Sequence, residues 1–345
     1  MKVLIYSKDF YPSCGGVEDV TFMTCNELTK LGCDVTLITN TPGEANNHYG
    51  FKLIRTPSFF LVIKEYIKCD VFIHEVLSLR MLYPLLFGKK KWVCVHHQVD
   101  LPNNFKTRLK KIAMRLCHNV AVSKTTAVGY GLKKYKVIYN AYNPNVFYNT
   151  NNDMSKRTDF VYIGRLHPDK GLDMLINAYV RLKRDTNMSW KLNIIGGGDC
   201  LYVEGLKKKV ANWGCKDDVV FYGLKSHEEA AVIINRCRVG IVPSTYREAF
   251  GLTVLQLIAC GCLVIGSDGD GISEVLGGTG LLFKKKSEED LYSAMLRAVN
   301  MDDSTYTEYC KAERERVSIF IPQMLGVNYF SYLKSIVEED GATTD

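Results

Sequence analysis

The chain has 345 residues, of which 47% are hydrophobic and 23% are charged, a composition typical of a soluble globular protein that can form two domains. No stretch reaches the roughly 18 apolar residues of a membrane span, and the sequence opens on a strand pattern rather than on a signal peptide. The 12 cysteines are scattered and form no CxxC pair. We therefore expect a cytoplasmic protein with reduced, mostly buried thiols and no bound metal.

Positive charge is concentrated in the first half of the chain. Residues 1–150 hold 20 Lys and Arg against 10 Asp and Glu, a net charge of +10, whereas the remainder holds 24 against 27, a net charge of −3. Within the segment 105–117, cations (Lys106, Arg108, Lys110, Lys111 and Arg115) alternate with apolar residues at helical spacing (Phe105, Leu109, Ile112 and Leu116). This pattern favours a helix with a solvated basic face, and peripheral contact with an anionic membrane is the alternative. We expect no nucleic-acid partner, and a monomer or weak dimer.

The chain begins with the pattern of a parallel α/β sheet. Residues 2–7 predict a strand, a helix follows to about Leu31, and residues 34–39 predict the next strand. The turn before the helix carries Gly15 and Gly16, whose bare amides suit a phosphate or a sugar oxygen. It is not a dinucleotide fingerprint, because the GxGxxG spacing is absent.

Histidines follow the next two predicted strands. Strands near residues 71–73 and 92–95 end at His74 and at His96-His97, and a third near 120–122 ends at Ser123. Ligands of open α/β sheets bind beyond the carboxyl ends of the strands. At least one of these histidines is therefore a candidate site residue, although a histidine at a strand end is more often structural.

The segment 137–147 and the polar run 149–157 after it break the α/β pattern and mark the domain boundary, and a second α/β series follows. Its first strand, 160–163, leads to Gly164-Arg165 and then to Lys170-Gly171 before an amphipathic helix. Strand 192–195 runs into the glycines 196–198, a helix covers about 201–213, and strand 219–222 ends at Gly223. Each glycine turn marks a place where backbone must come close to another group.

The stretch 240–274 has the strongest pattern for a binding site. A strand over 239–242 is followed by a loop with Arg247 and Glu248, and Phe250-Gly251 opens a helix that ends near Cys260-Gly261. Amides at the start of this helix can receive phosphate oxygens, and the Glu248 carboxylate can accept bonds from hydroxyls. The alternative is an ordinary βαβ unit with a charged loop. Beyond it we expect an edge strand ending at Phe283, a helix over 287–299 and a helical tail over 318–338.

Three motifs, in order, resemble the signatures of glycosyltransferase family 4, whose members are retaining enzymes of the GT-B fold. The motifs are Gly164-Arg165-Leu-His-Pro-Asp-Lys170-Gly171, Ile194-Ile-Gly-Gly-Gly-Asp199 and Val242-Pro-Ser-Thr-Tyr-Arg-Glu248-Ala-Phe-Gly251. The resemblance extends to Gly15-Gly16, to the hinge 140–147 and to 260–267, and so covers most of the chain. It implies two Rossmann-like, doubly wound parallel-sheet domains that face each other across a cleft.

The resemblance also implies a separate role for each domain. An acceptor domain would span residues 1–148, a nucleotide-sugar domain 149–317, and a final helix within 318–345 would cross back to the first domain. The predicted catalytic residues are Glu248, His96, Arg165 and Lys170, with His97 as the alternative histidine. The predicted donor-binding residues are Gly15, Gly16, Gly164, Arg165, Lys170, Gly196, Gly197, Gly223, Glu248, Ala249, Phe250, Gly251, Leu252, Thr253 and Gln256.

By the same resemblance, Arg165 and Lys170 would neutralise the diphosphate, while Glu248 and the amides after it would hold hydroxyls of the sugar. The reaction would be a front-face displacement in which the leaving diphosphate takes the acceptor proton. We expect transfer of a hexose from a UDP- or GDP-sugar, such as UDP-glucose or GDP-mannose, to a glycan, glycolipid or glycoprotein, as in polysaccharide biosynthesis. Acceptor contacts would come from first-domain loops such as 42–50.

Two positions bear on activity. The family's second glutamate, which binds the ribose, is replaced by Gln256, and an amide accepts hydroxyl bonds without the strengthening of a charge. An inactive nucleotide-sugar-binding protein is thus one alternative, and a nucleotide-sugar epimerase or hydrolase of the same fold is another. Asp268-Gly-Asp270 looks like a metal motif, but it stands where the family has a Gly-rich loop. We therefore expect no essential metal or other cofactor.

Overall fold

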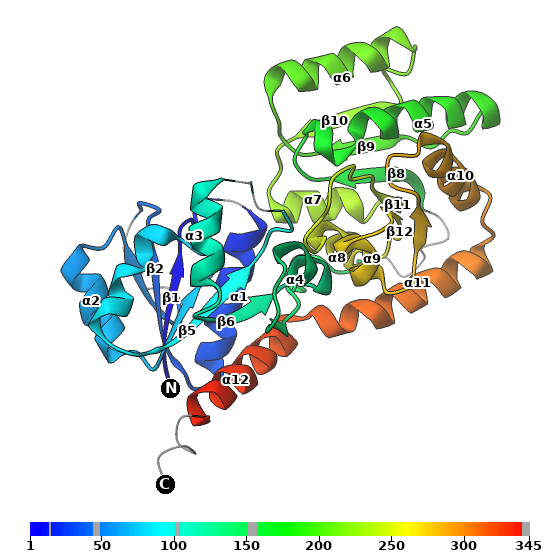
Figure 1. Ribbon diagram of the computed structural model, residues 1–345. Helices are drawn as coiled ribbons and strands as arrows, with labels where there is room; N and C mark the ends of the chain where they lie inside the picture. The colour runs from blue at the N-terminus through cyan, green and yellow to red at the C-terminus, as the bar shows by residue number, and fades with distance from the viewer. Residues whose placement is uncertain (14, 44–48, 101, 103, 151–156, 340–345) are drawn as a thin grey trace. The chain divides into compact units, whose positions relative to one another are not determined.

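The structure is a computed structural model, and it describes residues 1–13, 15–43, 49–100, 102, 104–150 and 157–339. Contacts divide the chain into two compact units (Figure 1). The first unit comprises Met1–Ala141 together with Phe320–Asp345, and the second comprises Tyr142–Ile319. The chain thus leaves the first unit once and returns to it with its last helix.

The first unit is built on a seven-stranded sheet in which every pair of neighbouring strands is parallel. The order is β3-β2-β1-β4-β5-β6-β7, so the chain first winds outward from β1 and then returns to add strands on its other side. The strands are β1 (Lys2–Ser7), β2 (Asp34–Thr39), β3 (Lys52–Arg55), β4 (Val71–His74), β5 (Lys91–His96), β6 (His118–Ala121) and β7 (Lys136–Val137).

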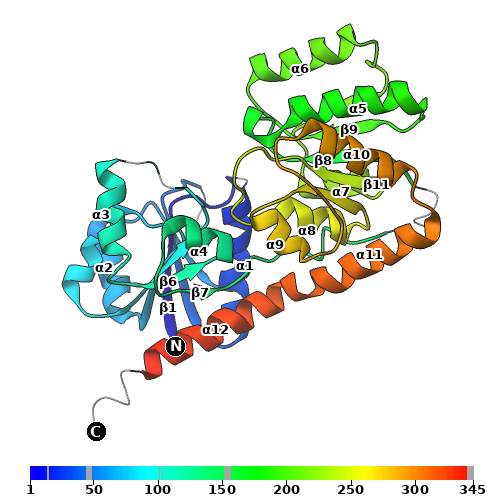
Figure 2. The ribbon, with the colours of Figure 1, turned by 45° about the vertical axis from the view of Figure 1, so that its right-hand side comes forward.

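Helices cover this sheet. They are α1 (Gly16–Lys30), α2 (Phe59–Lys68), α3 (Phe105–Ala113), α4 (Lys124–Tyr130) and α12 (Pro322–Glu338), with 3-10 turns η1 (Leu79–Met81) and η2 (Tyr83–Phe87). In Figures 1 and 2, α12 lies beside α1. The contact is close because Gly326 has no side chain: a Cβ added there would lie 2.5 Å from Cβ of Glu27.

The second unit repeats the same winding on six parallel strands, in the order β10-β9-β8-β11-β12-β13. The strands are β8 (Thr158–Ile163), β9 (Leu192–Ile195), β10 (Val219–Gly223), β11 (Cys237–Val242), β12 (Leu263–Ser267) and β13 (Leu281–Phe283). The helices are α5 (Leu172–Thr186), α6 (Cys200–Asn212), α7 (His227–Ile234), α8 (Leu252–Ala259), α9 (Gly271–Leu276), α10 (Glu288–Val299) and α11 (Asp303–Val317), with 3-10 turns η4 (Pro168–Lys170) and η5 (Ser318–Phe320).

The central strands are apolar because helices cover both of their faces, as parallel sheets require. All six residues of β11 are buried, and so are five of the six in β1. The prediction of two Rossmann-like, doubly wound domains is confirmed. The sequence patterns missed the edge strands β3 and β7 and helices α2, α4, α9 and α11.

The cysteines of the described chain are free thiols, and most of them are buried, as the sequence predicted. Within the described residues, no helix is long and apolar enough to cross a membrane.

Candidate functional site

The winding of the second sheet brings two sequence motifs together. β8 and β11 are neighbours at the point where the strand order reverses, and the loops after them carry Lys170 and Glu248. Ligands of such sheets bind at this switch point. The two loops are joined directly, because Thr245 donates to the Asp169 carbonyl oxygen from both its N–H (2.8 Å) and its hydroxyl (3.0 Å). Gly171 permits this approach, since a Cβ there would lie 2.0 Å from the Pro243 carbonyl oxygen.

Glu248 lies at the centre of a compact polar cluster. Its Oε1 is 2.6 Å from the Lys170 ammonium and accepts a 2.6 Å hydrogen bond from the Ser244 hydroxyl. Its Oε2 accepts a 2.8 Å bond from the Tyr246 hydroxyl, which itself accepts a 2.8 Å bond from Lys170. The Glu248 side chain is 13% exposed and that of Lys170 is 19% exposed, so the pair can still be reached by a ligand.

The charge state of Glu248 follows from these contacts. Burial alone would raise the pKa of Glu248, but the Lys170 charge and the hydrogen bonds from Lys170, Ser244 and Tyr246 outweigh burial and hold the pKa below its ordinary value. Glu248 is therefore an ionised acceptor at neutral pH. Burial and the nearby Glu248 charge raise the pKa of Tyr246, so its hydroxyl remains a donor.

Asp270 fixes the backbone of Glu248. The Glu248 N–H donates to Asp270 at 3.1 Å, and the Glu248 carbonyl accepts from the Gly271 N–H at 3.1 Å. Asp270 also forms an ion pair with Lys285, whose ammonium donates to the Tyr246 carbonyl at 3.0 Å. Burial lowers the pKa of Lys285. The sequence patterns singled out none of Ser244, Tyr246 or Lys285, although Tyr246 stands only two positions before Glu248.

The loop 268–270 has partners of its own. Asp268 accepts a 2.8 Å bond from the Ser273 hydroxyl, and Asp270 caps α9 through the Ile272 N–H at 3.3 Å. In the described part of the chain, no group of three or more His, Cys, Asp or Glu is placed to hold a metal ion. These contacts fit the interpretation of this segment as a structural loop.

Helix α8 begins directly after the Glu248 loop. Gly251 precedes its first residue with φ of 106°, a conformation that favours glycine. Leu252 and Thr253 form the first turn, where the N–H groups of a helix lack partners within the helix. Gln256 lies on the same side as Thr253, three residues further along. Phe250 is 3% exposed and belongs to the core, so its side chain is not open to a ligand.

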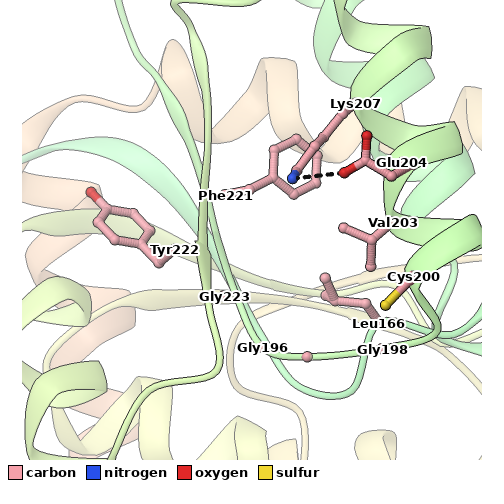
Figure 3. Close-up of a pocket in the computed structure, with 11 residues that line it drawn as sticks. Leu166, Gly196, Gly198, Cys200, Val203, Glu204, Lys207, Phe221, Tyr222 and Gly223 are labelled. Atoms are coloured by element: carbon pink, nitrogen blue, oxygen red, sulfur yellow. Dashed lines mark hydrogen bonds and ion pairs between the residues drawn. The ribbon is translucent and has the colours of Figure 1, made fainter.

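A pocket of about 390 Å³ lies at the carboxyl ends of β8, β9 and β10. It contains three of the predicted donor residues, Gly196, Gly197 and Gly223 (Figure 3). The β8 and β9 loops touch here, because a Cβ on Gly196 would lie 1.8 Å from the Gly164 carbonyl oxygen. Glu204 and Lys207 of α6 form a 3.1 Å ion pair on one wall. Figure 3 shows that Phe221 and Tyr222 extend to opposite sides of β10.

Arg165 lies in the loop after β8, and its side chain is exposed. Its backbone is fixed by the Tyr162 hydroxyl, which donates to the Arg165 carbonyl at 2.8 Å. The guanidinium is near enough to the cluster to oppose the upward shift in the pKa of Tyr246. Arg165 is thus a cation close to the Lys170 and Glu248 pair.

The predicted histidines end strands of the first unit. Burial lowers the pKa of His96 to about 4, so the ring is neutral, and its Nε2 lies 2.8 Å from the Asn119 side-chain oxygen. His97 Nε2 lies 2.9 Å from a carboxylate oxygen of Glu75, which is fully buried. His74 packs among the rings of Tyr6, Phe72 and Trp92, and burial lowers its pKa to about 3, so it is a core residue.

Gly15 and Gly16 form the start of α1 in the first unit. The Glu18 carboxylate lies beside them, since a Cβ on Gly15 would be 2.5 Å from its Oε2. A site that joins these glycines and His96 to the Glu248 cluster stays a prediction. In the loop 42–50, residues 44–48 lie outside the described residues.

Residues 149–316 match the sequence model of a family described as Glycosyl transferases group 1. An uncharacterized glycosyltransferase of Methanocaldococcus jannaschii is 31% identical over 173 residues, 48% of this chain and 44% of that protein. The gpi3 subunit of phosphatidylinositol N-acetylglucosaminyltransferase from Schizosaccharomyces pombe is 26% identical over 342 residues, 87% of this chain and 73% of the subunit. For the first of these relatives, the matched part is less than half of that protein's length.

Among solved structures, Anabaena HepE in complex with UDP has a TM-score of 0.83 at 18% identity and covers 97% of this chain and 100% of its own. HepE is also solved with UDP-glucose, with a TM-score of 0.80. At this identity the likeness shows the fold. The expected GT-B class is therefore confirmed as a two-domain α/β architecture, whereas the facing of the domains across a cleft stays a prediction.

Proposed function

We propose that the protein is a retaining glycosyltransferase that moves a hexose from a nucleotide diphosphate sugar to a glycan, glycolipid or glycoprotein acceptor. The observation that carries the proposal is the cluster of Lys170, Ser244, Tyr246 and Glu248 at the switch point of the second sheet. It combines a cation for phosphate with an ionised carboxylate for hydroxyls. The family match over 149–316 includes the whole cluster.

The donor's groups have complementary partners here. Lys170 and the exposed Arg165 supply positive charge to the diphosphate, and the first-turn amides of α8 supply further donors. Glu248, kept ionised by its neighbours, accepts hydrogen bonds from the sugar hydroxyls. The nucleoside occupies the pocket lined by Gly196, Gly197 and Phe221. UDP-sugars are the first donors to test, since HepE is solved with UDP and UDP-glucose, and GDP-sugars are the second.

The reaction we propose is a front-face displacement. The bond between the sugar's anomeric carbon and the diphosphate oxygen breaks, and the acceptor oxygen forms a bond to the same face of that carbon. The acceptor proton passes to the departing diphosphate, so no protein nucleophile is needed. The protein contributes positioning and charge stabilisation. The proposed displacement requires no metal.

Incubation with UDP-, GDP- and ADP-sugars, with and without glycan acceptors, tests the proposal. The expected result is acceptor-dependent release of one nucleoside diphosphate, with slow hydrolysis when acceptor is absent. The Glu248→Gln variant should lose about 100-fold or more of kcat/KM, because the amide loses the charge that strengthens its bonds to the sugar. Asp268→Asn, a substitution in the neighbouring loop, serves as the control and should retain activity.

Other outcomes separate the alternatives. Full turnover of donor without acceptor would indicate an epimerase or hydrolase of the same fold. Binding of a nucleoside diphosphate without any product would indicate an inactive binding protein, which Gln256 makes a specific alternative. If the protein neither binds nor turns over any of the donors, the proposal is contradicted.

A further inference from the structure

Helix α3 of the first unit presents a row of apolar side chains to solvent. Phe105, Leu109, Ile112 and Leu116 are spaced by four, three and four residues and so form one stripe along the helix and the turn after it. Their exposed fractions are 72%, 39%, 56% and 77%. Large apolar side chains gathered in this way usually mark a binding surface.

The stripe faces away from the body of the unit. Thr107 and Ala113 of α3, and Met114 directly after it, are 5%, 7% and 4% exposed and mark the packed side. At about 100° per residue, Thr107 and Met114 lie opposite the four apolar positions, and Ala113 lies between the two sides. The Asn104 side chain caps the helix by accepting from the Thr107 N–H at 2.9 Å, so the orientation is fixed locally. Figures 1 and 2 show α3 in the outer helix layer of this unit.

Cations border the stripe on both sides. Lys106 lies on one flank, and Arg108, Lys111 and Arg115 lie on the other; all four side chains are exposed. The surrounding sequence does not neutralise them, because residues 101–152 contain nine Lys and Arg and no Asp or Glu. An apolar stripe between two basic flanks suits the boundary between anionic headgroups and acyl chains.

More apolar surface lies over the same face of the sheet. Buried residues of α2 and α3 share one hydrophobic core cluster with the sheet, so both helices belong to one layer. In α2 and η2, Phe60 and Leu86 are 81% and 85% exposed, and Phe59 stacks on Tyr83 with ring centroids 4.7 Å apart. The apolar side chains of this layer are therefore not confined to one helix.

We propose that the α3 surface, defined as Phe105, Leu109, Ile112 and Leu116 with their flanking cations, docks peripherally on an anionic phospholipid bilayer. The apolar stripe enters the headgroup boundary while the long Lys and Arg side chains reach the lipid phosphates beside it. A protein groove would match the apolar stripe, but the excess of cations on both flanks specifically matches an anionic surface. This inference does not depend on the transfer reaction.

Sedimentation of the full chain with vesicles tests the inference. The protein should pellet with vesicles of phosphatidylcholine and phosphatidylserine at low salt, and much less at high salt or with phosphatidylcholine alone. Lys106→Gln/Lys111→Gln should bind about 25-fold more weakly, since each cation near an anionic surface contributes roughly five-fold. Phe105→Ser/Ile112→Ser should bind at least about ten-fold more weakly, through loss of apolar burial.

Matched controls lie on exposed positions of the second unit. Leu201→Ser/Val232→Ser removes two apolar side chains that are 85% and 55% exposed, and Lys208→Gln/Lys311→Gln removes two cations. Both controls should pellet as wild type does. All positions changed in the two α3 variants and the two control variants are exposed. Circular dichroism and thermal unfolding should therefore be the same in every variant as in wild type.

Three results would overturn the inference. The first is wild-type protein that stays in the supernatant with phosphatidylserine vesicles at low salt. The second is α3 variants that pellet like wild type. The third is a dimer in light scattering that Phe105→Ser/Ile112→Ser converts to a monomer while vesicles bind neither form, since the stripe would then be covered by a second copy of the chain.

Discussion

The backbone N–H of Glu248 donates a 3.1 Å hydrogen bond to the carboxylate of Asp270, which stands 22 residues later in the chain. Through the same carboxylate, Asp270 binds Lys285 beyond the edge strand, and Lys285 in turn binds the Tyr246 carbonyl. Glu248 is thus held by its side chain on the Lys170 side and by its backbone on the Asp270 side. Because both the side chain and the backbone of Glu248 are held, little conformational entropy is lost when the carboxylate binds a ligand.

We predict that Asp270 acts as a positioning residue for Glu248. Asp270→Ala leaves the Glu248 N–H and the Lys285 ammonium without this partner, which should lower the unfolding free energy by about 2–4 kcal/mol. Donor affinity should fall about ten-fold. Asp270→Asn keeps an acceptor oxygen but loses the charge, so its effects should be smaller. Chemical denaturation and calorimetric titration with UDP or GDP measure both quantities.

The control for this prediction is Asp268→Asn, because the Asp268 carboxylate is exposed and is bound by the Ser273 hydroxyl rather than by Glu248 or Lys285. If Asp268→Asn and Asp270→Ala reduce donor affinity equally, the effect belongs to the loop as a whole and not to the Asp270 contact.

Substitution of glycine by alanine should have opposite effects at two positions of the second unit. Gly196→Ala places a Cβ 1.8 Å from the Gly164 carbonyl at φ of 146°, and should cost about 2–4 kcal/mol of stability and abolish nucleotide binding. Gly205→Ala, within α6 and with open space around it, should stabilise the protein by about 0.5–1 kcal/mol. Thermal unfolding with and without UDP distinguishes them. A Gly196→Ala variant that binds nucleotide normally would contradict a donor site at this wall.

Gln256→Glu tests ribose recognition at α8. A carboxylate accepts stronger hydrogen bonds than an amide, so UDP or GDP should bind about five-fold more tightly, about 1 kcal/mol. The affinity for the 2′,3′-dideoxy nucleotide, which lacks the ribose hydroxyls, should not increase. Gln323→Glu, at an exposed position of α12, is the charge-matched control. Equal gains with the ribose and dideoxy nucleotides would mean that position 256 does not contact the ribose.

The buried carboxyl group of Glu313 should make the stability of the protein depend on pH. Its side chain is fully buried, its Oε1 accepts a 3.0 Å bond from the Val264 N–H, and burial raises its pKa well above 4.5. Above pH 4.5 the unfolded chain has lost a proton that the folded chain keeps. The unfolding free energy therefore falls by about 1.4 kcal/mol per pH unit until the folded pKa is reached.

Glu313→Gln cannot titrate, so it should gain stability relative to wild type as the pH rises from 4.5 toward neutrality. Urea unfolding of both proteins at several pH values measures the difference between their unfolding free energies. The contributions of all other titrating groups cancel in this difference. Parallel pH profiles would show that Glu313 is ionised in the folded protein.

The sequence alone was enough to predict most of the architecture. Apolar runs such as 192–195 and 239–242 predict buried parallel strands, because helices cover both faces of such strands. Caps such as Ser287 locate helix starts through local hydrogen bonds, and Ser287 does accept from the Asp290 N–H at 3.1 Å. The resemblance to a known family also implied that Lys170 and Glu248 share one site. The structure gives the reason, because each follows a strand, β8 or β11, and these two strands are neighbours in the sheet.

Only the tertiary structure decided which further groups complete the site. Lys285 follows an edge strand that has no motif, and it reaches Asp270 and Tyr246 only because β13 pairs with β12. Likewise, spacing gave α3 one apolar and one basic side, but periodicity does not show which side packs on the sheet. Packing placed Thr107 and Met114 inside and left Phe105 in solvent, since that choice depends on contacts between segments distant in the chain.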